Sequence, residues 1–320
     1  MKDVSVVIPI CCPYRELITI VDRLIRQTYN IKEIILINTK RCFDGSLLVL
    51  DEIEERLKAI NKESILKIYE ITAEEFDHGG TRDMGLKMAS SRYVMFMTQD
   101  AVPKNSKLVE TLISNFDDES VAISYARQFP KDNCRYIERF IRKFNYPEYN
   151  IRKTKKDIDT MGVKAFFNSD VCAMYDKEKY EIYGGFPAKI IFGEDAVAAY
   201  KALENDFCVV YSSKSKVLHS HNYSIVQNFQ RNFDIGVSQK QLDYIYSKVS
   251  SENEGIKLVK DTVKHLITKK KFFAIPGFII QSGAKFIGYR LGKMYTLLPD
   301  KIVVACSMNK GYWKRGNKNA

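Results

Sequence analysis

The sequence predicts an α/β fold with a doubly wound, mostly parallel sheet, followed by a helical, amphipathic tail. Three observations indicate this fold. Short runs rich in Val and Ile alternate with amphipathic stretches four times within the first hundred residues. These runs are apolar at nearly every position, which is typical of parallel strands that are covered on both faces. Beyond about residue 250 the chain changes to basic, amphipathic segments.

Strand and helix alternate in the first part of the chain, as a parallel sheet with crossover helices requires. Strands are expected over residues 3–10, 33–37, 65–71 and 93–97. The first helix carries one apolar stripe, formed by Leu17, Ile20, Val21, Leu24 and Ile25. Two further helices are expected over residues 44–60 and 79–89.

The second part of the chain is less regular. Strands are expected over residues 121–125 and 207–211, with a strand pair between residues 162 and 175. Helices are expected over residues 195–203 and 224–246. A chain of 320 residues can form one large domain or two. We expect a main unit over residues 1–250, with halves over about 1–100 and 101–250, and a tail over 251–320.

The net charge of +11 is concentrated in the tail. From residue 252 onward there are 14 Lys and Arg against 4 Asp and Glu, a surplus of 10, so the preceding part is almost neutral. A protein that binds nucleic acid through its main domain would carry its basic residues there. We therefore expect no nucleic-acid partner.

The tail has the composition of a segment that lies on a membrane. Residues 272–289 are largely apolar, but Pro276, Gln281 and Lys285 make the stretch too polar and too broken to span a bilayer. No signal peptide is visible, and seven scattered cysteines without a CxxC pair indicate a reducing compartment. The expected location is the cytoplasm, with the tail on the anionic inner face of the cell membrane. The alternative is that the apolar residues pack on the main unit or on a second subunit.

Polar residues follow the fourth strand, where Asp100 comes directly after an apolar run and Gln99. Open α/β sheets bind ligands beyond the carboxyl ends of their strands, and an acid there can hold a metal ion against a diphosphate. The alternative is that Asp100 only caps the next segment. Pro9 and Asn38 end two neighbouring strands, and Asp44 follows them, so these residues are expected to form a nucleotide pocket.

A glycine pair opens the third predicted helix. Gly80 would let the backbone approach a diphosphate closely, and Arg82 could pair with phosphate oxygens. An ordinary turn at a helix start would use the same glycines, so this motif is weak alone.

Five short motifs occur in one order, and together they resemble a known family. They are HGGTRDMG at 78–85, TQDA at 98–101, YARQFP at 125–130, GED at 193–195 and HSHNYS at 219–224. This set resembles family 2 glycosyltransferases of the GT-A fold, and is most similar to bacterial rhamnosyltransferases of surface-polysaccharide assembly. The resemblance covers about residues 3–247 and, more weakly, the tail.

The resemblance implies a site for Mn²⁺ or Mg²⁺. Asp100 resembles the last acid of the family's metal motif. Gln99 stands in the place of its first acid and is expected to contact the donor. His219 or His221 could supply a further ligand, because imidazole suits Mn²⁺ better than Mg²⁺. If both lie on a strand they point to opposite faces, so only one should reach the metal. The resemblance favours His219.

The resemblance also implies roles for residues in both halves. Asp195 resembles the catalytic base of inverting enzymes, and Glu194 a neighbour that orients it; the alternative is two acids placed favourably at a helix start. Arg127 and Gln128 are expected to touch the acceptor, although a solvated loop would explain them equally well. Asn38 stands where the family usually has an Asp, and its carbonyl can still accept a hydrogen bond from a base ring.

The sequence therefore predicts a metal-dependent inverting glycosyltransferase. By resemblance, it would move L-rhamnose from dTDP-rhamnose to a growing, lipid-linked cell-surface polysaccharide. One alternative is a UDP- or GDP-linked sugar as donor; another is a glycan- or nucleotide-binding module without activity. A nucleotidyltransferase would be expected to carry a Gly-rich, Lys-containing loop after its first strand, and residues 10–14 are not one.

Overall fold

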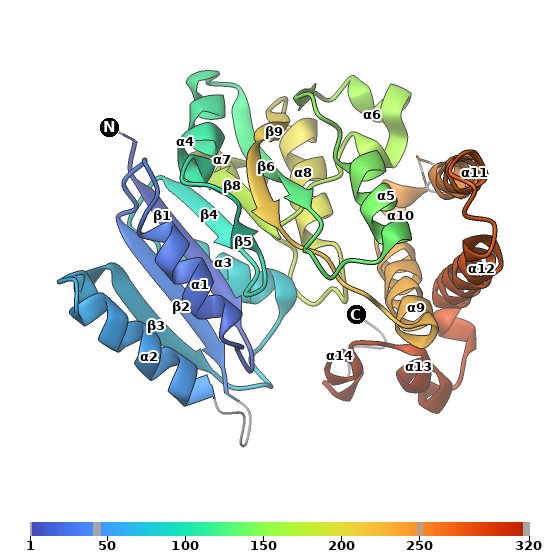
Figure 1. Cartoon of the computed structure of the whole chain (residues 1–320), viewed down its shortest axis with the longest axis horizontal. Coiled ribbons are helices and arrows are strands. Elements are labelled where there is room, and N and C mark those ends of the chain that lie inside the picture. Colours follow the sequence, from blue (N-terminus) through green and yellow to red (C-terminus); the bar gives the residue numbers. More distant parts are fainter. Residues whose placement is uncertain (1, 41–45, 248, 250–251, 316–320) are drawn as a thin grey trace.

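The computed structural model describes residues 2–40, 46–247, 249 and 252–315. One mixed sheet runs through the molecule in the order β3-β2-β1-β4-β8-β6-β9-β5, and β7 pairs with β9 (Figure 1). The strands are β1 Val4–Ile10, β2 Glu33–Thr39, β3 Leu66–Ile71, β4 Tyr93–Met97, β5 Val102–Pro103, β6 Val121–Phe129, β7 Ile151–Lys153, β8 Cys172–Asp176 and β9 Cys208–Leu218.

Helices cover both faces of the sheet. One face packs on α1 (Glu16–Leu24), α2 (Ser46–Lys58) and α4 (Leu108–Ile113), and the other on α3 (His78–Met88), α7 (Lys177–Tyr183) and α8 (Glu194–Glu204). This double cover explains why β1, β2 and β4 are rich in apolar residues that face both sides of the sheet. The expected doubly wound α/β fold is confirmed. The sheet is mixed: β1 pairs in parallel with β2 and β4, as do β2 with β3 and β6 with β9, and the other four pairings are antiparallel.

The predicted strand pair between residues 162 and 175 is wrong. Residues 162–164 form a short 3₁₀ helix after α6 (Asp157–Met161), and only β8 follows as a strand. β8 lies antiparallel between β4 and β6 and is wholly buried, whereas the polar segment before it forms a loop. Because β8 is antiparallel, its first residue lies at the same edge of the sheet as the carboxyl ends of β4 and β6.

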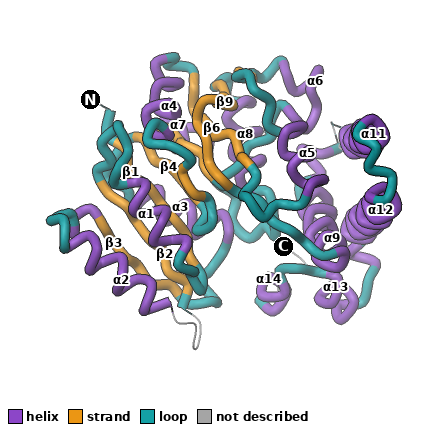
Figure 2. Tube along the Cα trace, in the orientation of Figure 1, coloured by secondary structure: helices purple, strands orange, loops and turns teal. Residues whose placement is uncertain are grey.

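The tail is helical and packs beside α9 (Ile225–Gln241), away from the parallel strands (Figure 2). The other helices of this region are α5 Tyr136–Asn145, α10 Asp243–Tyr246, α11 Glu252–Thr268, α12 Ala274–Lys293, α13 Asp300–Cys306 and α14 Lys310–Lys314. Within the part of the chain that the structure describes, no helix is long and apolar enough to cross a membrane.

Glycines let α12 and α9 cross at very short range. A Cβ atom at Gly288 or Gly292 would lie only 2.3 or 2.1 Å from the carbonyl oxygens of Phe229 and Phe233 on α9. A Cβ atom at Gly236 of α9 would lie 2.3 Å from a carbonyl oxygen of α12. Larger residues at these positions would force the helices apart, so one side of α12 is part of the folded structure.

The end of the tail completes a third apolar cluster. Its buried members come from α9 and from the segments on either side, and they are Ile191, Phe233, Val237, Tyr295, Val303, Tyr312 and Trp313. The Tyr312 hydroxyl donates to the carbonyl oxygen of Lys189 at 3.0 Å. The alternative considered for the tail, packing on the main unit, therefore holds for one of its faces.

Candidate functional site

A first group of polar side chains lies where β4 and β9 end. β5 pairs Val102 with Leu218, the last residue of β9. This pairing brings Asp100, just before β5, beside His219, just after β9. The Nε2 atoms of His219 and His221 each lie 3.4 Å from Oδ2 of Asp100. One potential ligand atom of each residue lies within 4.8 Å of the other two.

The prediction that only one of the two histidines reaches this point is wrong. It assumed that the two side chains point to opposite faces of a strand, but residues two apart in a strand share a face. β9 ends at Leu218, so His219 and His221 lie in the following loop, where the backbone is free to turn. Their rings meet edge to face with centroids 4.6 Å apart, and His221 stacks on Tyr223.

The electrostatics of this group suit a cation. Burial lowers the pKa of His219, and burial together with the neighbouring His219 lowers the pKa of His221 to about 4. Burial raises the pKa of Asp100, but interactions with His219 and Thr98 outweigh it and hold this pKa well below its usual range. At neutral pH the group therefore offers two neutral imidazoles and one carboxylate, a donor set that fits Mn²⁺.

Gln99 joins the ends of β4 and β1. Its Oε1 accepts from the backbone N–H of Cys11 at 2.8 Å, and its Nε2 donates to the Cys11 carbonyl at 2.9 Å. A carboxylate could not make the second bond, because it has no proton to donate. The amide at this position thus holds the loop beyond β1 near Asp100, His219 and His221, which we call the metal-type group. The predicted contact of Gln99 with the donor stays a prediction.

A second group of polar side chains lies at the start of α8. Gly193 caps this helix with a positive φ of 84°, a conformation that favours glycine, and Glu194 and Asp195 form the first turn. Arg82 of α3 pairs with Glu194 at 2.8 Å and with Asp170 at 3.2 Å, and all three of these side chains are buried. Arg82 was expected to contact a phosphate; the structure places it among carboxylates instead, so that role stays a prediction without structural support.

The two acids of α8 titrate in opposite directions. Burial and the negative charge of Glu194 raise the pKa of Asp195 to about 7, although Arg82 opposes this. Burial also raises the pKa of Glu194, but Arg82 and His78 outweigh burial and lower it overall. Opposed shifts of two neighbouring carboxyls are the pattern of a site in which one acid exchanges a proton and the other stays ionised.

Asp170 is a site residue that sequence reasoning missed. Its backbone N–H donates to Oδ2 of Asp195 at 3.3 Å, and its carboxyl accepts from the Tyr175 hydroxyl at 2.6 Å. Its neighbour Ser169 accepts a hydrogen bond from Nε2 of Gln128 at 2.9 Å. The segment before β8 therefore joins the two polar groups. A polar run directly before an apolar strand was the available signal, but only an antiparallel β8 places that run at this edge.

The predicted nucleotide pocket is described in part. Pro9 and Asn38 lie at the ends of β1 and β2, where Asn38 is opposite Ile10. Asn38 is buried, and its Oδ1 has no hydrogen-bond partner among the residues that the structure describes. Asp44 lies outside the described residues. The backbone N–H of Gly80 donates to the capping Asp77 side chain at 2.7 Å, so this amide already has a partner.

Arg127 and Gln128 point to opposite sides of β6, because successive strand residues alternate. The guanidinium of Arg127 pairs with Glu148 at 3.0 Å and lies over the ring of Phe129. Gln128 instead faces the metal-type group, where its Oε1 lies 2.9 Å from Nδ1 of His219. Of the two residues expected to contact the acceptor, only Gln128 lies at the site.

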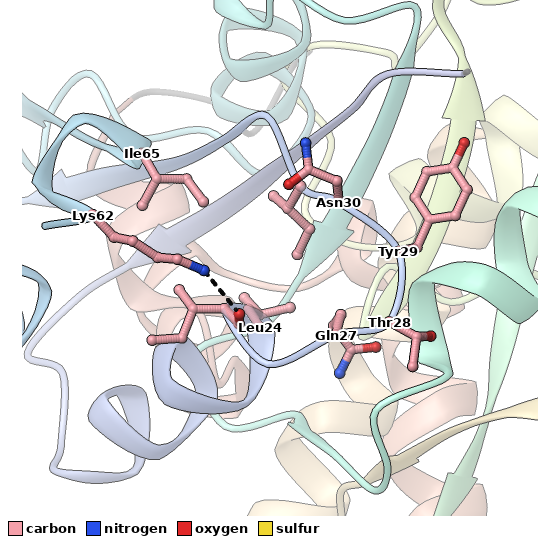
Figure 3. A pocket seen from close by; sticks show the side chains of 9 residues that line it. Leu24, Gln27, Thr28, Tyr29, Asn30, Lys62 and Ile65 are labelled. Atoms are coloured by element: carbon pink, nitrogen blue, oxygen red, sulfur yellow. Dashed lines mark hydrogen bonds between the residues drawn. The ribbon is translucent and has the colours of Figure 1, made fainter. Parts of the chain in front are cut away.

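A separate pocket of about 200 Å³ lies before the start of β2, at the edge of the sheet opposite to this site (Figure 3). Its nine lining residues come from the end of α1, the following loop and the segment before β3, and the Lys62 side chain donates to the carbonyl of Ile25 across it at 3.4 Å. None of the lining residues is an acid, a histidine or a cysteine. The lining of this pocket therefore lacks the carboxylates, imidazoles and thiolates that usually bind a metal ion.

Comparisons with known proteins identify the family of the chain. A family model described as "Glycosyl transferase family 2" matches residues 5–184. The chain is 36% identical over 245 residues to the O-antigen chain rhamnosyltransferase WbaN of Salmonella anatum, covering 76% of this chain and 78% of that protein. It is 32% identical over 281 residues to the O-antigen chain rhamnosyltransferase RfbN of Salmonella typhimurium, covering 87% and 89%.

A solved structure shows the same fold at low sequence identity. The mannosyltransferase PcManGT of Pyrobaculum calidifontis, solved in complex with GDP-Man and Mn²⁺, matches with a TM-score of 0.55 and 14% identity. The match covers 98% of this chain and 85% of that chain. At this identity the likeness is evidence for the fold alone, and it confirms the expected GT-A architecture.

Proposed function

The chain belongs to glycosyl transferase family 2, and on this premise we propose that it is an inverting enzyme that extends a cell-surface polysaccharide. The donor would be a nucleotide sugar, dTDP-rhamnose in the first place, and the acceptor a glycan carried on a lipid. One observation carries the proposal: the segment before β8 bonds to Asp195 and to Gln128, and so places the candidate base beside the group of Asp100 and the two histidines at one edge of the sheet.

In the proposed reaction Asp195 takes the proton of the acceptor hydroxyl. That oxygen forms a bond to the anomeric carbon of the donor while the bond from this carbon to the diphosphate oxygen breaks, and the electron pair leaves with the nucleoside diphosphate. Attack from the side opposite to the leaving group inverts the anomeric configuration. A carboxyl whose pKa lies near neutrality is well matched to this task, because a general base works best near the operating pH.

Asp100, His219 and His221 would hold a divalent cation. Their donor atoms converge, both rings are neutral at pH 7, and the mixed nitrogen and oxygen set favours Mn²⁺ over Mg²⁺. When bound, the ion would act as a Lewis acid that stabilises the departing diphosphate. The likeness to a fold that was solved with Mn²⁺ supports this assignment.

The ends of β1 and β2 would bind the nucleotide base. A buried amide oxygen without a partner costs free energy unless a ligand supplies a donor, and Oδ1 of Asn38 has no partner among the described residues. Thymine and uracil both carry a ring N–H that could donate to Oδ1 and a carbonyl that could accept from Nδ2. The Asn38 amide therefore fits a pyrimidine base. Guanine presents the same pair of a ring N–H and an adjacent carbonyl, so the preference for a dTDP-linked donor rests on the rhamnosyltransferase relatives.

The outer face of α12 would hold the enzyme on the membrane, where a lipid-linked acceptor presents its hydroxyls. Large apolar side chains are exposed along this helix and just before it, and the most exposed are Phe272, Phe273, Ile279, Ile280, Phe286 and Ile287. The preceding Lys269, Lys270 and Lys271 are also exposed. An apolar face beside a cationic cluster suits an anionic bilayer surface, so we propose a peripheral enzyme on the inner face of the cell membrane.

One assay tests the class and the donor together. Purified full-length protein is incubated with Mn²⁺ and a panel of dTDP-, UDP- and GDP-sugars, and release of the nucleoside diphosphate is measured. We expect the fastest donor turnover with dTDP-rhamnose. A faster reaction with a UDP- or GDP-sugar would replace the donor and keep the enzyme class, whereas binding of a nucleotide sugar without turnover, even with extracted lipid-linked acceptors, would favour the inactive binding module.

A further inference from the structure

Gln128 contacts the first group of the site in a way that no motif explains. Its Oε1 lies 2.9 Å from Nδ1 of His219 and also accepts a hydrogen bond from the guanidinium of Arg142 on α5. Its Nε2 donates to the Ser169 hydroxyl at 2.9 Å. Gln128 and His219 are both buried, so these contacts are shielded from water.

The guanidinium settles which way the Gln128 amide faces. Arg has only donors, so the Gln128 atom that it contacts must be the oxygen. Ser169 imposes no orientation, because a hydroxyl can donate or accept. The same Oε1 atom therefore faces Nδ1 of His219. Since an amide oxygen can only accept, Nδ1 must carry the proton.

The tautomer of His219 determines which of its ring nitrogens can bind a metal ion. In a neutral imidazole only one nitrogen carries a proton, so protonated Nδ1 leaves a lone pair on Nε2. Nε2 is the atom that lies 3.4 Å from Oδ2 of Asp100. Two acceptors that face each other repel unless a cation lies between them. The hydrogen bonds behind His219 thus prepare the Asp100 side of the ring for a metal ion.

We propose that Gln128, oriented by Arg142, is a positioning residue that fixes the Nδ1–H tautomer of His219 and so directs Nε2 to a divalent cation. This inference deepens the proposed metal site and rests on it. Partners behind a metal-binding histidine commonly set its tautomer and ring orientation, and their loss costs about 10–100-fold in metal affinity. Gln128 would then support the metal, where the sequence suggested that it touches the acceptor.

The first test determines the tautomer of His219 in the wild-type protein. The protein is labelled with ¹⁵N in histidine and studied without metal at pH 8, and long-range ¹H–¹⁵N correlations report which ring nitrogen of His219 is protonated. A His219→Gln variant assigns the signal. We expect the Nδ1–H form; an Nε2–H form in the wild-type protein would overturn the proposal.

The second test measures Mn²⁺ affinity by calorimetry and by electron paramagnetic resonance. Gln128→Met keeps the side-chain length but removes the acceptor, and we expect about 10–100-fold weaker binding. Gln128→Glu keeps an acceptor for both His219 and Arg142 and should bind within a few-fold of wild type. Lys143→Met, a change of an exposed cation on the same helix as Arg142, is the control and should leave the affinity unchanged.

The Arg142→Met variant tests whether the guanidinium sets the orientation of the Gln128 amide, while the contact between Gln128 and His219 remains possible. Without the guanidinium the Gln128 amide can turn over, so the His219 signal should shift toward the Nε2–H form and Mn²⁺ should bind more weakly. A Gln128→Met protein that is folded by circular dichroism and binds Mn²⁺ like wild type would refute the proposal. A wild-type protein that binds no Mn²⁺ would instead refute the metal site itself, while the tautomer would still decide the role of Gln128.

Discussion

The backbone N–H of Asp170 donates to the carboxylate of Asp195 at 3.3 Å, and this bond ties the candidate base to the loop before β8. The preceding residue, Ser169, is bonded to Gln128, which contacts His219. A base and a metal-type group that come from different parts of the chain are thus held by one short segment. Fixed geometry of this kind is what transfer between two bound sugars requires.

The first prediction concerns the base. Asp195→Asn should keep the fold and donor binding but lower kcat by about 10²–10⁴-fold, the usual contribution of a general base. Steady-state transfer and calorimetry with the donor check this. Glu204→Gln, at the exposed end of the same helix, is the control and should retain full activity. Near-normal transfer by Asp195→Asn would mean that another group is the base.

The second prediction is a pH dependence. Asp195 must be ionised to accept a proton, and its pKa is raised to about 7, so kcat/KM should fall as the pH is lowered through the neutral range. Glu194→Gln removes a negative neighbour that raises this pKa, so the acidic limb of the profile should move to lower pH. The pH profiles of both proteins test the sign. A wild-type limb near the ordinary Asp value of about 3.9 would contradict it.

The third prediction concerns the metal. Excess EDTA should abolish transfer, and added Mn²⁺ should restore it. Asp100→Ala and His219→Ala should each weaken Mn²⁺ binding by more than the roughly 10–100-fold that loss of a partner behind a metal-binding histidine costs. Glu119→Ala, which removes an exposed acid far along the chain, serves as the control for charge. Full activity in EDTA would exclude a catalytic metal.

The fold was predictable from sequence where local pattern and long-range structure agree. β1, β2 and β4 are buried on both faces, so their apolar runs identify them without knowledge of their neighbours. β8 is equally apolar, but its direction depends on its pairing with β4 and β6, which are distant in sequence. The wrong strand pair and the missed Asp170 both follow from that direction.

The site was predictable as a set of residues but not as a set of contacts. Asp100, Asp195 and His219 lie at the sheet edge where they were expected, because they follow strand ends or begin a helix, whereas His221 was expected to point away and their roles stay predictions. The contacts of Arg82 and Gln128 were not predictable, since they depend on which side chains the sheet brings opposite them. Arg82 meets two buried acids, and Gln128 meets a histidine ninety-one residues later in the chain.

The fourth prediction concerns the nucleotide base. Calorimetry should show tighter binding of dTDP than of UDP or GDP. Asn38→Leu should weaken dTDP binding by about 2–10-fold, which corresponds to one net hydrogen bond of about 0.5–1.5 kcal/mol. Asn30→Leu changes the same residue type in the separate pocket at the opposite edge of the sheet and should have no effect. Equal losses in the two variants would remove Asn38 from the nucleotide pocket.

The last prediction concerns the membrane. Truncation near residue 250 would not be a fair test, because α12 packs on α9 and the end of the tail completes an apolar cluster, so the shortened chain would expose its core. Substitutions on the exposed face leave that packing intact. Full-length protein should sediment with anionic liposomes at low salt and be released at high salt, since each basic residue near such a surface contributes about 1 kcal/mol. The triple change of Phe273, Ile280 and Ile287 to Glu should abolish sedimentation, whereas Ile182→Glu, which alters an equally exposed residue on α7, should not. If the triple variant still sediments, or wild type ignores the liposomes, the exposed face of α12 serves another partner.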